Sequence, residues 1–116
     1  MYSAQQQISL PNSLLQLINE IIWTTTVDGQ LLYANPALER IYGRPLADFR
    51  TDPWLWLAVI HPDDQSLARR HHHLLLEQGQ TEATYRMIRP DGQTRWLRNQ
   101  MHLLYDDSGQ PHQIGG

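Results

Sequence analysis

Residues 82–105 read EATYRMIRPDGQTRWLRNQMHLLY, and this stretch decides the fold. Apolar and polar residues alternate from Glu82 to Met87, which is the pattern of a β-strand with one buried face. Pro90-Asp91-Gly92 then supplies turn-forming residues, and a second run extends from Gln93 to Tyr105. The stretch therefore predicts a long antiparallel hairpin.

A long helix is predicted immediately before this hairpin. His61-Pro62-Asp63-Asp64 is typical of a helix start, because proline suits the first turn and the two carboxylates face the positive end of the helix dipole. The helix is expected to end at Gly79, after about four turns. Since this role accounts for Asp63 and Asp64, no acid–base pair is assigned to them.

A second hairpin is predicted nearer the start of the chain. Ile21–Val27 is rich in β-branched and aromatic residues, and Gln30–Ala34 forms its partner strand. Asp28-Gly29 between them is interpreted as a two-residue turn in which both positions have positive φ. Asn35 and Pro36 then predict a helix start, with the asparagine amide as the cap and the proline in the first helical position.

The remaining elements are expected to be shorter. Arg44–Ile60 is irregular and predicts one or two helical turns, Asp106–Gly109 turns the chain, and Gln110–Gly116 begins a fifth strand. Residues 1–12 are expected to be a flexible leader, and an amphipathic flanking helix begins at Ser13. The order of these elements predicts a single α+β domain over residues 13–116. We expect it to form a five-stranded antiparallel sheet with helices packed on one face.

Charge and residue usage exclude several classes of function. The net charge of −3 leaves no basic surface for nucleic acid, and no apolar run approaches the roughly 20 residues that cross a bilayer. We therefore expect no nucleic-acid partner, no membrane contact and a cytoplasmic location. The chain has no cysteine, and all nine basic residues are arginine, which excludes thiol nucleophiles, cysteinyl-flavin adducts and Schiff-base lysines. No nucleophile or phosphate-loop motif is present, so no catalytic residue is expected.

The order and spacing of several short motifs resemble the bacterial PAS domain subtype that carries His-Pro-Asp-Asp and Asp-Gly…Arg-Trp motifs. The resemblance covers residues 13–116. The motifs are Asp28-Gly29, Tyr33-Ala34-Asn35-Pro36-Ala37, His61-Pro62-Asp63-Asp64, Tyr85-Arg86, Asp91-Gly92 and Arg95-Trp96.

The resemblance implies a sensory or interaction module of a larger signalling protein. Such domains bind a small molecule or a partner, or dimerise, and relay a conformational change to an effector. The effector implied is a histidine kinase, with a diguanylate cyclase or phosphodiesterase as the alternative. The C-terminal output linker of this subtype is not recognised before Gly116.

Three consecutive histidines, His71, His72 and His73, raise the question of a metal or haem site. Successive helical residues project about 100° apart, so the three cannot converge on one ion, and no metal site is predicted. Haem needs only one imidazole, and the resemblance allows this helix to supply it. The helix leucines place His71 in the apolar stripe, whereas the family pattern points His72 inward, so both stay open. We favour the interpretation that one of these histidines belongs to the core or its rim. The alternative is that it binds haem in a gas or redox sensor.

Aromatic and apolar side chains predict either a simple core or a small-ligand pocket. Asn35 and Tyr42 are the candidate polar contacts for such a ligand. The full set of pocket candidates is Trp23, Tyr33, Asn35, Leu38, Tyr42, Trp54, Trp56, His71, His72, Leu75, Tyr85, Met87 and Met101.

A docking surface is predicted around Trp96 and Leu104. In the long second strand Leu97, Met101 and Leu103 share one face, so Trp96 lies on the opposite, outer face. A large exposed apolar side chain often marks a protein contact. We expect the flanking helix, a second copy of the domain or a neighbouring module to cover Trp96. A second copy, which would form a dimer, is the partner predicted.

Overall fold

The five strands of the described chain form one antiparallel sheet in the order β2-β1-β5-β4-β3. The structure, a computed structural model, describes residues 20–116, so the predicted leader and the residues that begin the flanking helix lie outside it. The strands are β1 (Trp23–Thr26), β2 (Leu31–Ala34), β3 (Gln80–Ile88), β4 (Thr94–Tyr105) and β5 (Pro111–Gly115). The helices are α3 (Ala37–Tyr42), α4 (Leu46–Thr51), α5 (Leu55–Ala58), the 3₁₀ turn η1 (Pro62–Asp64) and α6 (Gln65–Gln78).

The predicted long hairpin is confirmed as β3 and β4. The strands pair without interruption from Gln80 opposite His102 to Ile88 opposite Thr94. Tyr85 and Met87 are buried on the inner face, whereas Trp96 on the outer face is 67% exposed. The period-two alternation of the sequence therefore assigned the two faces of this hairpin correctly.

The first hairpin has a different turn from the one expected. Thr26 N–H donates to the Gln30 carbonyl at 2.8 Å, which closes a three-residue loop rather than a two-residue turn. Only Gly29 in this loop has positive φ, at 99°, so the prediction that Asp28 shares it is wrong. The Asp28 carboxylate instead accepts a hydrogen bond from the Thr26 hydroxyl, which supports a turn followed by one left-handed glycine.

Asn35 does not cap α3 as predicted. Its side chain is buried and joins the segment before β1: the Ile22 N–H donates to Oδ1 at 3.0 Å, and Nδ2 donates to the Glu20 carbonyl at 2.8 Å. No side chain caps α3, and Pro36 takes the N-cap position. The Asn35 amide bonds to residues 20–22 because the backbone polar groups of that segment would otherwise lack hydrogen-bond partners.

The start of the long helix also differs from the prediction. Pro62–Asp64 form η1, and α6 follows from Gln65 to Gln78 with Gly79 in a left-handed C-terminal position. The Asp64 carboxylate turns toward β3, where it accepts hydrogen bonds from the Arg86 backbone N–H, Nε and Nη2 at 2.8–2.9 Å. These bonds lower the pKa of the Asp64 carboxyl. Asp64 therefore joins the helix start to the sheet as well as occupying the first turn.

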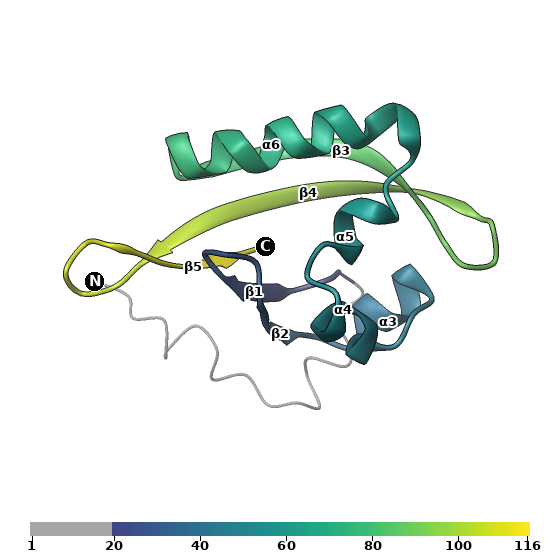
Figure 1. Ribbon diagram of the computed structural model, residues 1–116, viewed down its shortest axis with the longest axis horizontal. Coiled ribbons are helices and arrows are strands. Elements are labelled where there is room, and N and C mark those ends of the chain that lie inside the picture. Colours follow the sequence, from purple (N-terminus) through teal and green to yellow (C-terminus); the bar gives the residue numbers. More distant parts are fainter. Residues whose placement is uncertain (1–19) are drawn as a thin grey trace.

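The helices of residues 20–116 lie on one face of the sheet, as predicted, with α6 along β3 and β4 and the short helices α3, α4 and α5 near β1 and β2 (Figure 1). The buried residues form three hydrophobic clusters. One joins α5 and α6 to β3 around Met87, one joins α6 to β4 and β5 around Leu75, and one joins α3 and α4 to β2 around Leu38. Trp23, Tyr42 and Leu55 each pack against two of these clusters, so partly buried side chains join the clusters into one core.

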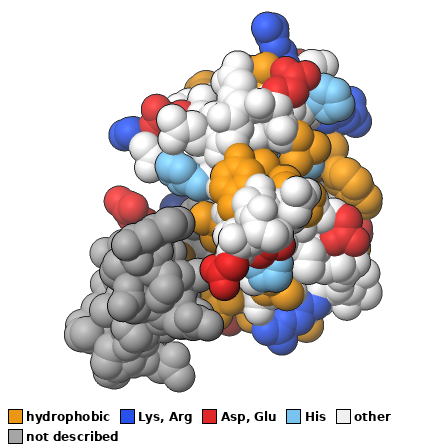
Figure 2. All heavy atoms as spheres, turned by 90° about the vertical axis from the view of Figure 1, so that its left-hand side faces the viewer, with side chains coloured by type: hydrophobic (Ala, Val, Ile, Leu, Met, Phe, Trp, Pro, Cys, Tyr) orange, Lys and Arg blue, Asp and Glu red, His pale blue; other side chains and the backbone are white. Residues whose placement is uncertain are grey.

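The end of the molecule where α6 stops and β4 turns toward β5 carries exposed apolar side chains. Leu76 on α6 and Tyr105 on β4 are among the exposed large hydrophobic residues. Figure 2 shows this end, where hydrophobic side chains lie among charged and histidine side chains. No helix in residues 20–116 is long and apolar enough to cross a membrane.

Candidate functional site

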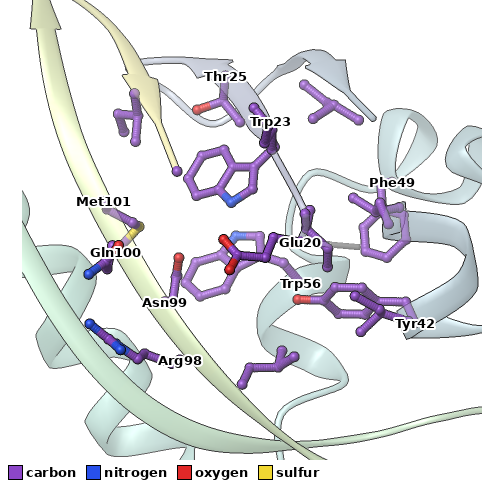
Figure 3. A pocket seen from close by; sticks show the side chains of 18 of the residues that line it. Glu20, Trp23, Thr25, Tyr42, Phe49, Trp56, Arg98, Asn99, Gln100 and Met101 are labelled. Atoms are coloured by element: carbon purple, nitrogen blue, oxygen red, sulfur yellow. The ribbon is translucent and has the colours of Figure 1, made fainter. Parts of the chain in front are cut away.

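A cavity of about 720 Å³ lies between the sheet and the helices, where the three hydrophobic clusters meet. Figure 3 shows Trp23 and Trp56 in the middle of the cavity, with Tyr42 and Phe49 on its helical side and β4 opposite. The Tyr42 and Phe49 rings meet edge to face, with centroids 5.1 Å apart. The volume lies within the range of about 300–1,000 Å³ typical of small-ligand sites.

The N-terminal part of β4 borders the cavity along the edge that faces away from β3. β4 pairs with β5 from His102 to Tyr105, and its residues from Thr94 to Met101 pair with β3 alone. The Leu103 N–H donates to the Gly79 carbonyl at 2.8 Å, so the backbone of Leu103 faces β3. Every second residue of β4 does the same, and the residues between them direct their backbone N–H and C=O groups away from β3. This explains why Trp96, Arg98 and Gln100, whose side chains belong to the outer face, also border the cavity.

Polar side chains also line the cavity, and two of them are joined by a hydrogen bond. The polar lining residues are Glu20, Thr25, Tyr42, His72, Tyr85, Arg98, Asn99 and Gln100. Asn99 Nδ2 donates to the Tyr85 hydroxyl oxygen at 2.7 Å, which leaves the phenolic proton and the amide oxygen available to a ligand. Burial raises the pKa of Tyr85, and the Asn99 hydrogen bond partly opposes it. Burial and the nearby Tyr85 raise the pKa of the Tyr42 phenol, so both phenols stay protonated at neutral pH. The two phenols therefore offer hydrogen-bond donors beside the aromatic side chains, and the Glu20 carboxyl offers an acceptor among them (Figure 3).

The structure distinguishes His71 from His72, the two candidates for the histidine that faces the cavity. His72 lines the cavity, and its ring centroid lies 5.8 Å from that of Trp56. His71 is 3% exposed and lies between α6 and β3, with its ring 6.3 Å from Tyr85. Neither ring nitrogen of His71 has a hydrogen-bond partner in the described part of the chain. His72, rather than His71, is the imidazole that a ligand in the cavity would meet.

We expect the buried His71 to make stability depend on pH. Burial lowers its pKa below the ordinary 6.5, so the unfolded state binds the proton first as the pH falls. The free energy of unfolding is then highest above about pH 6.5 and declines below it. His71→Leu should weaken this decline, as measured by urea unfolding between about pH 7.5 and about pH 5.

The exposed neighbour His73 supplies the control for this measurement. His73→Gln removes an exposed imidazole and leaves the buried His71 in place, so the decline that His71 causes should remain. His72, whose pKa is also lowered by burial, should supply the residual slope in His71→Leu. An unchanged slope in His71→Leu would contradict the argument from burial.

Seven of the thirteen predicted pocket residues line the cavity: Trp23, Leu38, Tyr42, Trp56, His72, Tyr85 and Met101. The structure places the other six outside the lining. Leu75 and Met87 are core residues, and His71 lies behind the cavity wall. Tyr33 is on the outer face opposite Thr24, and Trp54 is 58% exposed beside α5. Asn35 is bound to the backbone of residues 20–22.

Sequence reasoning missed the contribution of β4 and of the segment before β1. Leu97 and Asn99 belong to the inner face of β4 and share its alternation with Met101, so that alternation could have identified them. Phe49 and Pro53 lie in the irregular part between α3 and α6, where no periodicity was available. Residues 20–22 line the cavity because Asn35 holds them in place.

The predicted docking residues share the outer face but do not form one patch. Trp96 and Leu104 are eight residues apart on β4, which corresponds to about 26 Å along a strand. The Arg86 guanidinium lies 5.3 Å from the centroid of the Trp96 ring, a cation–π arrangement. Arg86 is itself bound by Asp64, so the cation that contacts the exposed indole has a defined position on the neighbouring strand.

Comparison with known proteins identifies solved structures of the same shape. A domain from a protein described as a light and redox sensing histidine kinase of Haloarcula marismortui is 29% identical, with 90% of each chain covered and a TM-score of 0.73. The N-terminal domain of a diguanylate cyclase with PAS/PAC sensor from Marinobacter aquaeolei is 29% identical, with 83% of this chain and 89% of that chain covered and a TM-score of 0.72. A PAS domain from Colwellia psychrerythraea is 20% identical, with 89% and 87% covered and a TM-score of 0.71.

Among curated proteins, none matches the chain. A family model matches residues 31–116, from β2 to the end of β5, and its description is the PAS fold. The match covers most of the chain, and the sheet with helices on one face agrees with it. The chain belongs to the PAS fold family.

Proposed function

We propose that this domain is the sensory module of a signal-transduction protein and binds a small ligand between its sheet and its helices. The observation that carries the proposal is the aromatic cavity of about 720 Å³, whose lining comes from all three hydrophobic clusters. A ligand there would touch α3, α5, β1 and β4 at once, so its binding would change how the helices pack on the sheet. The proposed module acts in the cytoplasm and has no catalytic activity of its own.

Two neighbouring residues of β1 allow a matched test. Thr25 lines the cavity, whereas Thr24 pairs with Tyr33 on the outer face. Native mass spectrometry of the purified chain should show a bound small molecule that is released on denaturation. Thr25→Phe should abolish this added mass by filling the cavity, and Thr24→Phe should retain it. Equal retention by both variants, or no added mass in the wild type, would oppose ligand binding at this site.

Haem is the second candidate ligand, because His72 presents an imidazole to the cavity beside Trp56. The absorption spectrum of the same preparation distinguishes it from a colourless ligand. A Soret band that is lost in His72→Ala and kept in His71→Ala would support a haem-based gas or redox sensor. A colourless sample that takes up no added haem would remove this alternative.

The proposed effector is a histidine kinase, with a diguanylate cyclase or phosphodiesterase as the alternative. The proposal rests on the two relatives at 29% identity, whose descriptions name a histidine kinase and a diguanylate cyclase. The complete coding sequence of the gene distinguishes them. A dimerisation helix with a phosphoacceptor histidine would support the histidine kinase. A nucleotide-cyclase domain would support the diguanylate cyclase instead.

We also propose that the domain associates with a second copy through Trp96. This indole is 67% exposed on the outer face, and large exposed aromatic side chains often mark protein contacts. Trp96→Ala should weaken self-association in analytical ultracentrifugation. Trp54→Ala, which removes an exposed indole on the helical side, should leave it unchanged. Unchanged association in Trp96→Ala would show that the dimer, if formed, uses another surface.

A further inference from the structure

A second, smaller pocket of about 300 Å³ shares no lining residue with the main cavity. It lies between the loop that joins α3 to α4, the end of α5, η1 and the end of β3. Its apolar lining residues are Ala58, Val59, Ile60, Pro62 and Ile88, and its polar lining residues are Arg44, Gln65 and Arg89. Two guanidinium groups thus meet an apolar surface in one small space.

Arg89 is fixed in this pocket by the chain itself. Its Nη1 donates to the carbonyls of Arg40 and Ile41 at the end of α3, at 2.8 and 2.6 Å, and its Nε donates to Asp91 at 3.3 Å. The guanidinium lies across Gly43, where a Cβ would come within 2.9 Å of Nη2. These contacts of Nε and Nη1 hold the guanidinium in position beside the end of α3.

Arg44 differs from Arg89 because the described chain supplies no acceptor for it. No carboxylate of residues 20–116 lies within 4.0 Å of its guanidinium, and its Nε is buried without a hydrogen-bond partner. Because that Nε has no accessible surface, a ligand in the pocket would reach the terminal amino groups of the guanidinium. A cation without a carboxylate partner beside an apolar surface favours an anionic acceptor from outside the chain. The carboxylate of Asp91 balances one of the two arginines, which leaves one positive charge at the pocket.

We propose that the pocket around Arg44 binds a small organic monoanion, a carboxylate with a short apolar body. The carboxylate would accept hydrogen bonds from the guanidinium of Arg44, a pairing that planar geometry favours, and the apolar body would rest on Val59, Ile60 and Ile88. The volume lies at the lower end of the range for small-ligand sites, which suits a molecule of the size of benzoate. The site is separate from the proposed sensory cavity and does not depend on it.

Benzoate and its uncharged analogue benzamide form a matched pair of probes. Titration of the full isotopically labelled chain with benzoate should give saturable amide shifts at Arg44, Ile88 and Arg89, measured by heteronuclear NMR. Benzamide at the same concentration should shift these signals much less, because it cannot pair with a guanidinium. Shifts confined to main-cavity residues such as Leu97 and Asn99, or no saturable shift at millimolar benzoate, would overturn the proposal.

Two arginine variants separate the pocket from general surface charge. Arg44→Gln should weaken benzoate binding by about tenfold or more, since a hydrogen bond to a charged group contributes at least that much. Arg50→Gln removes an exposed arginine on α4 that does not line the pocket and should leave the affinity unchanged. Equal weakening in both variants would indicate attraction by net charge alone and would contradict a built site. The comparison of benzoate with benzamide on the wild-type chain remains decisive if Arg44→Gln does not fold.

Discussion

Replacing Leu75 by alanine is expected to lower the free energy of unfolding by about 2–5 kcal/mol, the largest effect we predict for a single substitution. Leu75 has no exposed surface and packs against Met101, Leu103 and Ile114, so it joins α6 to both β4 and β5. The substitution removes buried apolar volume, and the surrounding sheet cannot close over the space. Since small domains have total stabilities of about 5–15 kcal/mol, urea unfolding should show a large shift of the midpoint.

Leu76 provides the control, because it follows on the same helix but is 46% exposed. Leu76→Ala should change the free energy of unfolding by at most about 0.5 kcal/mol, as is usual for surface substitutions. Similar losses in both variants would mean that the substitutions act through the helix itself and not through the cluster under Leu75.

Replacing Asn35 by alanine is expected to cost about 2–4 kcal/mol, the second largest effect. The side chain is 1% exposed and bonds to the Ile22 N–H and to the Glu20 carbonyl, so its loss leaves two backbone groups without their partners. Residues 20–22 form part of the cavity wall. We therefore expect thermal or urea unfolding to show the loss, and amide shifts of Ile21 and Ile22 to show that the wall has moved.

Asn99→Ala serves as the comparison for this prediction. Asn99 is a partly buried asparagine whose side chain makes one hydrogen bond, to the Tyr85 hydroxyl, in a cavity that water can enter. Its loss should cost about 1 kcal/mol. If Asn35→Ala were no more destabilising than Asn99→Ala, the two backbone contacts of Asn35 would not be the source of its effect.

The parts of the fold that sequence reasoning identified depend on local patterns. Alternation from Glu82 to Met87 and the Asp91-Gly92 turn predicted the β3–β4 hairpin, because the two faces of a strand repeat every second residue. Gly79 ended α6 as expected, since a left-handed position there favours glycine. The errors arose where a local rule competed with a distant partner, as when Asn35 bonded to Ile22 and not to its own helix.

The candidate site was predicted only in part for the same reason. Aromatic residues such as Trp23 and Trp56 line the cavity as expected, because large apolar side chains gather where helices cover the sheet. Trp54, two residues from Trp56, is exposed, and no periodicity in this short helical segment distinguishes the two. The Arg44 pocket was not predicted, because its residues come from four separate segments.

By itself the sequence determined the class of the fold and excluded thiol and lysine chemistry, since the strand alternation, the turns and the residue types are properties of the chain alone. Tertiary structure decided which histidine meets the cavity and where Asn35 bonds. These features follow from the strand order, in which β5 lies between β1 and β4. Strand order arises from contacts between residues far apart in the chain, and local patterns do not encode it.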